Sequence, residues 1–130
     1  MRIAIVDYGM GNIHSLKGAL TYICPSAEIT SVNDRYTLVF NGEVYNFKEI
    51  RKELTQKGYT FKSSSDTEVV LNAFAEWGSL CVERFVGMWA FVIYDKQTKV
   101  ITMSRDRYGI KPLYYFKNET CFVFASEIKA

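Results

Sequence analysis

Asn41 and Gly42 stand side by side and have the residue types needed to act on a carbonyl group. A side-chain amide and an adjacent backbone N–H can stabilise an oxyanion, and glycine lets a substrate carbonyl approach closely. The alternative is structural, because Asn-Gly between apolar residues is also a strong signal for a β-hairpin turn. The residues alone leave an oxyanion hole and a turn open.

Asp66 is a second candidate for chemistry. It follows Ser65 at the expected start of a helix, where the positive end of the helix dipole favours a carboxylate. It is therefore interpreted either as a helix cap or as the partner of a ligand's amino group. The cluster Arg105-Asp106-Arg107 is interpreted as surface charge at a strand end, without catalytic geometry of its own.

The N-terminal turn contains Gly9 and Gly11, but His14 occupies the place of the third glycine of a dinucleotide-binding fingerprint. We interpret this turn as scaffold and predict no cofactor. His14 is expected to face solvent on a helix rather than to act as a catalytic base.

The expected elements fall into two groups. Before the polar residues 33–35, hydrophobic periodicity predicts a strand at 2–7, a helix at 12–24 and a weak strand at 27–32. After them it predicts a strand at 36–40, a helix from Asn46 to Gly58 and a helix from Ser65 to Gly78, both with capping-box spacing. Two hairpins follow, with loops at 96–98 and 117–119.

The last two strands are apolar at nearly every position, in residues 113–116 and 121–124. Strands of this kind are expected to be covered on both sheet faces, one by another sheet and one by helices. The pattern therefore predicts a helix-sheet-sheet-helix sandwich.

Composition excludes several classes of protein. The 130 residues suit one compact domain, and 16 basic and 14 acidic residues without a like-charged run do not indicate nucleic-acid binding. Cys24, Cys81 and Cys121 lack the spacing of a disulfide framework or a metal site. The N-terminus has no long apolar stretch, so we expect a cytoplasmic protein without a membrane partner.

Five stretches together resemble the glutaminase domain of glutamine-hydrolysing asparagine synthetases, a class II amidotransferase with the N-terminal-nucleophile fold. The resemblance covers residues 36–130 and is carried by NGEVYN (41–46), SSDTEVVL (64–71), ERFVGMWAFVIYD (83–95), RDRYGIKPLYY (105–115) and FASEIKA (124–130). It implies that Asn41 and Gly42 form an oxyanion hole, that Asp66 binds the α-amino group of glutamine, and that Glu43 makes a further glutamine contact.

The same resemblance implies a nucleophile that this sequence does not show. The family uses a cysteine at the mature N-terminus, whereas this chain starts Met1-Arg2-Ile3. The opening MRIAIVDYGMGNIHSLKGAL instead resembles the start of the glutaminase subunit of imidazole glycerol phosphate synthase, a class I amidotransferase with a parallel doubly wound sheet. We interpret the chain as two glutaminase fragments joined near Asn33.

These observations predict an α+β fold: a truncated N-terminal-nucleophile-type α-β-β-α sandwich with antiparallel sheets in residues 34–130. A βα(β) unit of flavodoxin-like origin precedes it in residues 1–33, and the two are expected to pack as one compact domain. The expected function is that of an amidotransferase-like protein, inactive alone for want of its nucleophile. The alternative is a non-catalytic glutamine-binding or interaction module, and exposed edges of truncated sheets make a homo-oligomer an option.

Overall fold

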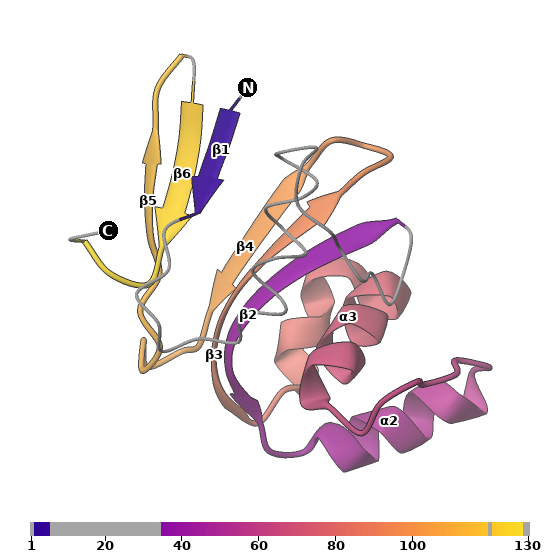
Figure 1. Cartoon of the computed structure of the whole chain (residues 1–130). Helices are drawn as coiled ribbons and strands as arrows, with labels where there is room; N and C mark the ends of the chain where they lie inside the picture. The colour runs from indigo at the N-terminus through magenta and orange to yellow at the C-terminus, as the bar shows by residue number, and fades with distance from the viewer. Residues whose placement is uncertain (1, 6–34, 120, 129–130) are drawn as a thin grey trace.

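The computed structural model describes residues 2–5, 35–119 and 121–128. Figure 1 shows how the elements of these residues are arranged. In chain order they are β1 (Arg2–Ile5), β2 (Tyr36–Val44), α2 (Phe47–Gln56), α3 (Asp66–Trp77), the 3-10 helix η1 (Gly78–Arg84), β3 (Gly87–Asp95), β4 (Ile101–Arg105), β5 (Tyr114–Lys117) and β6 (Cys121–Ala125).

The described elements form three layers. One sheet has the strand order β2-β3-β4 and the other has the order β1-β6-β5. Helices α2 and α3 cover one face of the first sheet, and the second sheet lies on its opposite side (Figure 1). The expected helix at 12–24 and strand at 27–32 lie outside the described residues, as does the boundary at Asn33.

Strand β2 is longer than predicted and continues through the Asn-Gly pair. It pairs antiparallel with β3 along nine residues, with Asn41 opposite Ala90 and Gly42 opposite Trp89. The hairpin interpretation of Asn41-Gly42 is therefore wrong. The pair sits within a ladder, near the end of the strand that leads into α2.

The two backbones approach each other closely at this end of the ladder. Gly42 has a φ of +148°, and a Cβ there would meet the carbonyl oxygen of Met88 and lie 2.6 Å from the Cα of Trp89. Across the ladder, a Cβ on Gly87 would meet the carbonyl oxygen of Glu43. Glycine is required on both strands because backbone occupies the space that a side chain would need.

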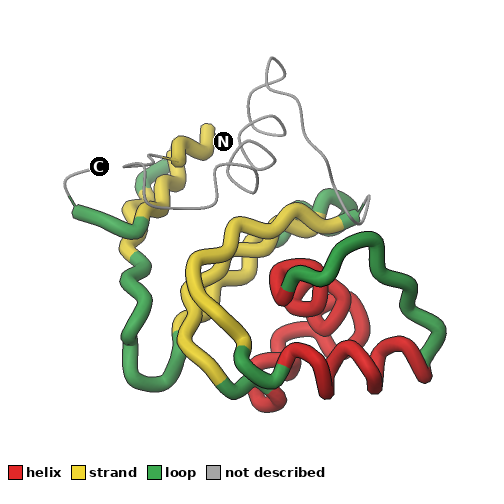
Figure 2. Tube along the Cα trace, turned by 60° about the horizontal axis from the view of Figure 1, so that its bottom comes forward, coloured by secondary structure: helices red, strands yellow, loops and turns green. Residues whose placement is uncertain are grey.

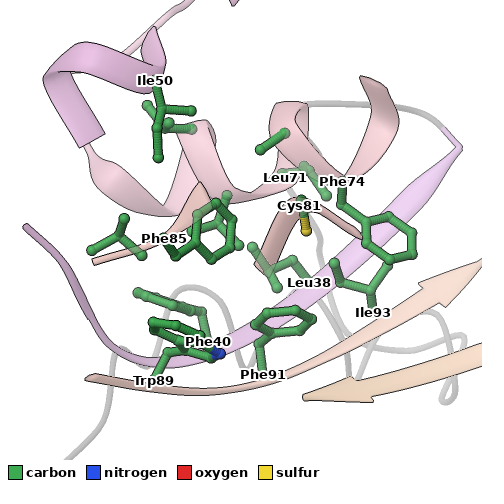
Figure 3. Close-up of a cluster of buried hydrophobic side chains, with 14 of the residues drawn as sticks. Leu38, Phe40, Ile50, Leu71, Phe74, Cys81, Phe85, Trp89, Phe91 and Ile93 are labelled. Atoms are coloured by element: carbon green, nitrogen blue, oxygen red, sulfur yellow. The ribbon is translucent and has the colours of Figure 1, made fainter. Parts of the chain in front are cut away.

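The main core lies between the two helices and the β2-β3-β4 sheet. Figure 3 shows side chains of β2 and β3, including Leu38, Phe40 and Phe91, meeting those of the helices. Two perpendicular ring contacts, each with centroids 5.5 Å apart, join Tyr36 to Phe74 and Phe85 to Trp89. Burying each such large apolar side chain contributes about 1.5–3 kcal/mol, so this layer supplies much of the stability.

Both predicted hairpins are confirmed: β3 pairs antiparallel with β4, and β5 with β6. Asp95 organises the first of the two turns. Its Oδ1 accepts hydrogen bonds from the N–H groups of Gln97 at 2.9 Å and Thr98 at 3.3 Å. Its Oδ2 lies 2.7 Å from a guanidinium nitrogen of Arg35. One carboxylate thus ties the start of β2 to the turn after β3.

The second sheet departs from the predicted antiparallel pairing at one strand. Strand β1 is described over Arg2–Ile5, within the predicted range 2–7, and it pairs parallel with β6, whereas the other described pairs are antiparallel. Phe122 and Phe124 of β6 are buried against Val92 in a cluster between the sheets. Strand β5, in contrast, is exposed along its length.

The expectation that β5 would be covered on both faces is therefore wrong. Tyr115 is 66% exposed and Phe116 is 58% exposed, although their side chains alternate between the two faces. The strand lies at the end of the described sheet, where only β6 is its neighbour. Its apolar composition therefore does not correspond to burial.

We predict that Gly42→Ala lowers the free energy of unfolding by about 3 kcal/mol, because it adds a steric clash to the strain of a positive φ. Gly58→Ala is the matched control, since Gly58 has a φ of +95° but a Cβ added there would meet nothing within 4 Å. The control change should cost about 1 kcal/mol. Urea unfolding measures both, and equal losses would contradict a close approach at Gly42.

Candidate functional site

Asp66 connects the start of α3 to the end of β2. Its Oδ2 accepts a hydrogen bond of 3.0 Å from the backbone N–H of Val44. The cap of the helix is Ser65, whose side chain accepts from the N–H of Thr67 at 3.0 Å. The capping interpretation of Asp66 is therefore wrong. No hydrogen bond within the described part of the chain occupies its Oδ1.

Asn41, Gly42 and Glu43 lie in the last four positions of β2. Asn41 is half-buried and Glu43 is exposed. Neither side chain is engaged in a hydrogen bond with residues 35–119 or the other described segments.

The structure brings the candidate residues to one region but does not join them all directly. Asp66 meets the strand at Val44, two residues beyond Gly42. Strand alternation puts Asn41 and Glu43 on the face opposite to Val44, which is buried in the main core. Asp66 thus reaches the strand from the helix layer, whereas Asn41 and Glu43 share the other face.

Asn46 precedes the first residue of α2, so the predicted start of this helix is confirmed. The capping bond that the capping-box spacing predicts is not made by its side chain. Its Nδ2 instead donates to the carbonyl of Arg84 at 2.9 Å, and its Oδ1 accepts from the N–H of Val86 at 2.9 Å. Tyr45 donates its N–H to the carbonyl of Val86 at 2.7 Å. The end of β2 is thereby fixed to the segment that enters β3.

Asp106 is buried, so the interpretation of Arg105-Asp106-Arg107 as surface charge is wrong for its central residue. Its carboxylate accepts hydrogen bonds of 3.0–3.1 Å from the N–H groups of Tyr108, Ile110 and Lys111. Its own N–H donates to the carbonyl of Trp89, the partner of Gly42 in the ladder. The start of the long loop from β4 to β5, visible in Figure 2, is therefore anchored beside the candidate strand.

The guanidinium of Arg105 also donates hydrogen bonds to this loop. Its Nε donates to the carbonyl of Lys111 and its Nη2 to the carbonyl of Gly109, each at 2.6 Å. Asp106 therefore satisfies N–H groups of this turn while Arg105 satisfies its carbonyls. The charge cluster has a structural role that its sequence pattern did not reveal.

Cys81 lies fully buried in the main core, where Figure 3 shows it among Leu71, Phe74 and the strands. Burial raises the pKa of its thiol to about 12. A thiol in this state is neutral near pH 7 and is a poor nucleophile. Of Cys24 and Cys121, the former lies outside the described residues, and the backbone of the latter belongs to β6.

Among the described residues there is no group of three or more His, Cys, Asp or Glu side chains that could hold a metal ion. A helix long and apolar enough to cross a membrane is also absent from this part of the chain.

Comparison with known protein families identifies the family of this chain. The family model of a glutamine amidotransferase domain matches residues 26–130. The chain therefore belongs to the glutamine amidotransferase domain family. The match begins before the boundary predicted at Asn33.

Its curated relatives include asparagine synthetases. The chain is 44% identical over 101 residues to asparagine synthetase [glutamine-hydrolyzing] 3 of Bacillus subtilis, covering 78% of this chain and 16% of that protein. It is 44% identical over 92 residues to putative asparagine synthetase [glutamine-hydrolyzing] 2 of Methanocaldococcus jannaschii, covering 71% of this chain and 17% of that protein. The chain thus spans only 16–17% of the length of these relatives.

Among solved structures, the chain is similar to a glutamine phosphoribosylpyrophosphate amidotransferase from B. subtilis, complexed with ADP and GMP. The TM-score is 0.61 at 25% sequence identity, over 76% of this chain and 23% of that chain. This neighbour supports a mixed α+β fold of the N-terminal-nucleophile amidotransferase type with antiparallel strand pairs. The roles of Asn41, Gly42, Glu43 and Asp66 stay predictions.

We predict that the protein loses stability as the pH falls below about 4, the ordinary range of an aspartate. Burial would raise the pKa of Asp106, but hydrogen bonds from the N–H groups of Lys111, Ile110 and Tyr108 hold it below its ordinary value. A pKa that is lower in the folded state stabilises the fold above the unfolded pKa, and that contribution disappears as the pH falls through the folded pKa.

The measurement is the urea midpoint across a pH series for the wild type and for Asp106→Asn. The variant should be less stable at neutral pH and should show a shallower fall in acid, because it lacks the titrating carboxylate. An equally steep fall in both proteins would show that Asp106 does not contribute to the acid sensitivity.

Proposed function

We propose that the chain binds glutamine at the end of β2 and does not hydrolyse it by itself. The observation that carries this proposal is the carboxylate of Asp66, which has one oxygen fixed by the N–H of Val44 and the other without a described partner. Membership of the glutamine amidotransferase family makes glutamine the ligand to consider first.

The chemistry of the candidate residues suits a zwitterionic amino acid. A carboxylate recognises an α-ammonium through a charge-assisted hydrogen bond, and Oδ1 of Asp66 is the available acceptor. The amide of Asn41 and the N–H of Gly42 are donors suited to the oxygen of a side-chain carboxamide. Glu43 is exposed beside them and is proposed as a further contact.

The proposal excludes hydrolysis because that reaction needs an activated nucleophile. Cys81 is enclosed in the core and has a raised pKa, so it cannot attack a ligand at the end of β2. Ammonia release from glutamine, measured with a coupled assay, should equal that of a heat-treated sample. Release above that level, abolished by a thiol-alkylating reagent, would overturn this part of the proposal.

We predict that Asp66→Asn weakens glutamine binding by about ten- to a hundredfold, the value of one charge-assisted hydrogen bond. The asparagine keeps an oxygen for the N–H of Val44, so the variant should still fold. Glu49→Gln is the matched control, because Glu49 is an exposed acidic residue in the first turn of the other helix, α2. Isothermal titration calorimetry measures all three proteins.

Equal affinity of the Asp66→Asn variant and the wild type would contradict the proposed site. Glutamate and D-glutamine serve as ligand controls, since the first changes the side-chain carboxamide and the second changes the direction of the α-amino group. Asp66 and the side chain of Asn41 lie on different sides of β2, so a ligand that contacts both must lie across the edge of this strand, which is at the end of its described sheet. Both analogues should bind more weakly than glutamine if the ligand makes these two contacts.

We also propose that residues 1–33 have a different origin from residues 34–130. The support is that the glutamine amidotransferase match leaves out residues 1–25, although it includes residues 26–33 before the proposed boundary. The chain is then a chimera of two glutaminase fragments.

A second candidate function, self-association, is favoured by the exposed aromatic residues of β5. This strand has a described neighbour on one side only, and an edge of this kind can pair with another strand. We predict that wild-type protein forms dimers in sedimentation experiments and that Phe116→Lys abolishes them without loss of folding. A monomeric wild type at all concentrations would rule out this function.

A further inference from the structure

Glu68 is a buried carboxylate whose role is not explained by the capping box. It is only 2% exposed, yet no basic side chain forms an ion pair with it among the described residues. Its Oε1 accepts from the N–H of Lys62 at 2.8 Å, and its Oε2 accepts from the N–H and the hydroxyl of Ser63, each at 2.7 Å. Three short bonds compensate for the removal of this charge from water.

The sequence pattern predicts a different partner for this residue. In a capping box Glu68 would accept from the N–H of Ser65, but that N–H donates to the hydroxyl oxygen of Ser63 at 3.3 Å. Burial would raise the pKa of Glu68, but the bonds from Lys62 and Ser63 lower it below its ordinary value. The carboxylate is therefore ionised and bound to the loop that precedes α3.

A chain of hydrogen bonds connects Glu68 to the residues before and after Asp66. Ser63, held by Glu68, accepts from the N–H of Ser65, and Ser65 in turn accepts from the N–H of Thr67. Asp66 stands between Ser65 and Thr67, and its own carboxylate is fixed to β2. The backbone on each side of Asp66 is thus connected to one buried carboxylate.

We propose that Glu68 is a positioning residue that holds the loop 62–66, so that the Asp66 oxygen without a described partner stays in place for the ligand. The inference rests on the proposed glutamine site. Glu68 itself cannot contact the ligand, because its carboxylate oxygens are buried and occupied by Lys62 and Ser63. Its effect on binding therefore acts through Asp66.

The test is Glu68→Gln, which keeps the volume of the side chain but replaces one acceptor oxygen by an NH₂ donor that faces a backbone N–H. Glutamine affinity, measured by calorimetry on protein shown to be folded by circular dichroism, should fall about fivefold or more. In the Asp66→Asn background the same change should have little further effect. Glu49→Gln is again the matched control.

Hydrogen exchange provides a readout that does not depend on glutamine. The amides of residues 62–67 should lose protection in Glu68→Gln, while those of the β2–β3 ladder keep theirs. Unchanged exchange in the loop would overturn the proposal, because Glu68 would then have no role in ordering the loop. Loss of protection throughout the ladder would also overturn it, because Glu68 would then have only a general role in stability. An affinity equal to that of the wild type, or an equal loss in the Asp66→Asn background, would also overturn it.

The two proposals fail in different ways. A wild-type chain that does not bind glutamine overturns the proposed function, and hydrogen exchange then decides by itself whether Glu68 orders the loop around Asp66. A wild-type chain that binds glutamine, with a Glu68→Gln variant that binds equally well, keeps the proposed function and overturns the role of Glu68.

Discussion

The antiparallel ladder between β2 and β3 is the constraint on which the rest of the structure depends. Its nine pairs place Gly42 opposite Trp89 and Val44 opposite Gly87. Backbone fills the space beside both glycines, so a shift of one residue would put a side chain where none fits. The register therefore determines which residues lie at the end of β2, where α3 attaches, and which residue of β3, bound by Asp106, lies opposite Gly42.

The carboxylates of four acidic residues then attach loops and strand ends to the neighbouring elements. Asp66 accepts from β2, Glu68 from the loop before α3, Asp95 from the turn after β3 and Asp106 from the loop after β4. Loops and strand ends carry N–H groups that the regular ladders do not satisfy, and a carboxylate can accept several of them at once. These four acidic residues thus act as backbone acceptors, whereas others in the described part of the chain, such as Glu53 and Glu76, form ion pairs with basic side chains.

Local patterns predicted the regular elements well because those elements depend on neighbouring residues. Both hairpins, α3 from Asp66 to the cap at Gly78, and the strand that starts at Tyr36 follow from periodicity and turn residues. The Asn-Gly pair was open to two interpretations because the same dipeptide fits a tight turn and a close approach of two strands. The pairing of Asn41 with Ala90, far along the chain in β3, excludes the turn, and no local pattern contains that information.

The hydrogen-bond partners of side chains were harder to predict than the elements. Asn46 and Glu68 both occupy capping positions by their spacing, yet Asn46 binds Arg84 and Val86, and Glu68 binds residues 62–63. The reason is that such a side chain can bind either its own helix or a neighbouring segment, and tertiary packing decides between them.

Recognition of an amino acid and attack on its carboxamide make different demands on this fold. The proposed recognition requires a fixed charge, and the bond from the N–H of Val44 fixes one oxygen of Asp66. Attack requires an ionised and accessible thiol, and the main core denies both to Cys81, since burial excludes the ligand and raises the thiol pKa together. The groups proposed to bind glutamine depend on the β2–β3 ladder and the start of α3, whereas a nucleophile would have to come from another part of the chain. The bonds that hold Asp66 in place therefore do not depend on the presence of a nucleophile.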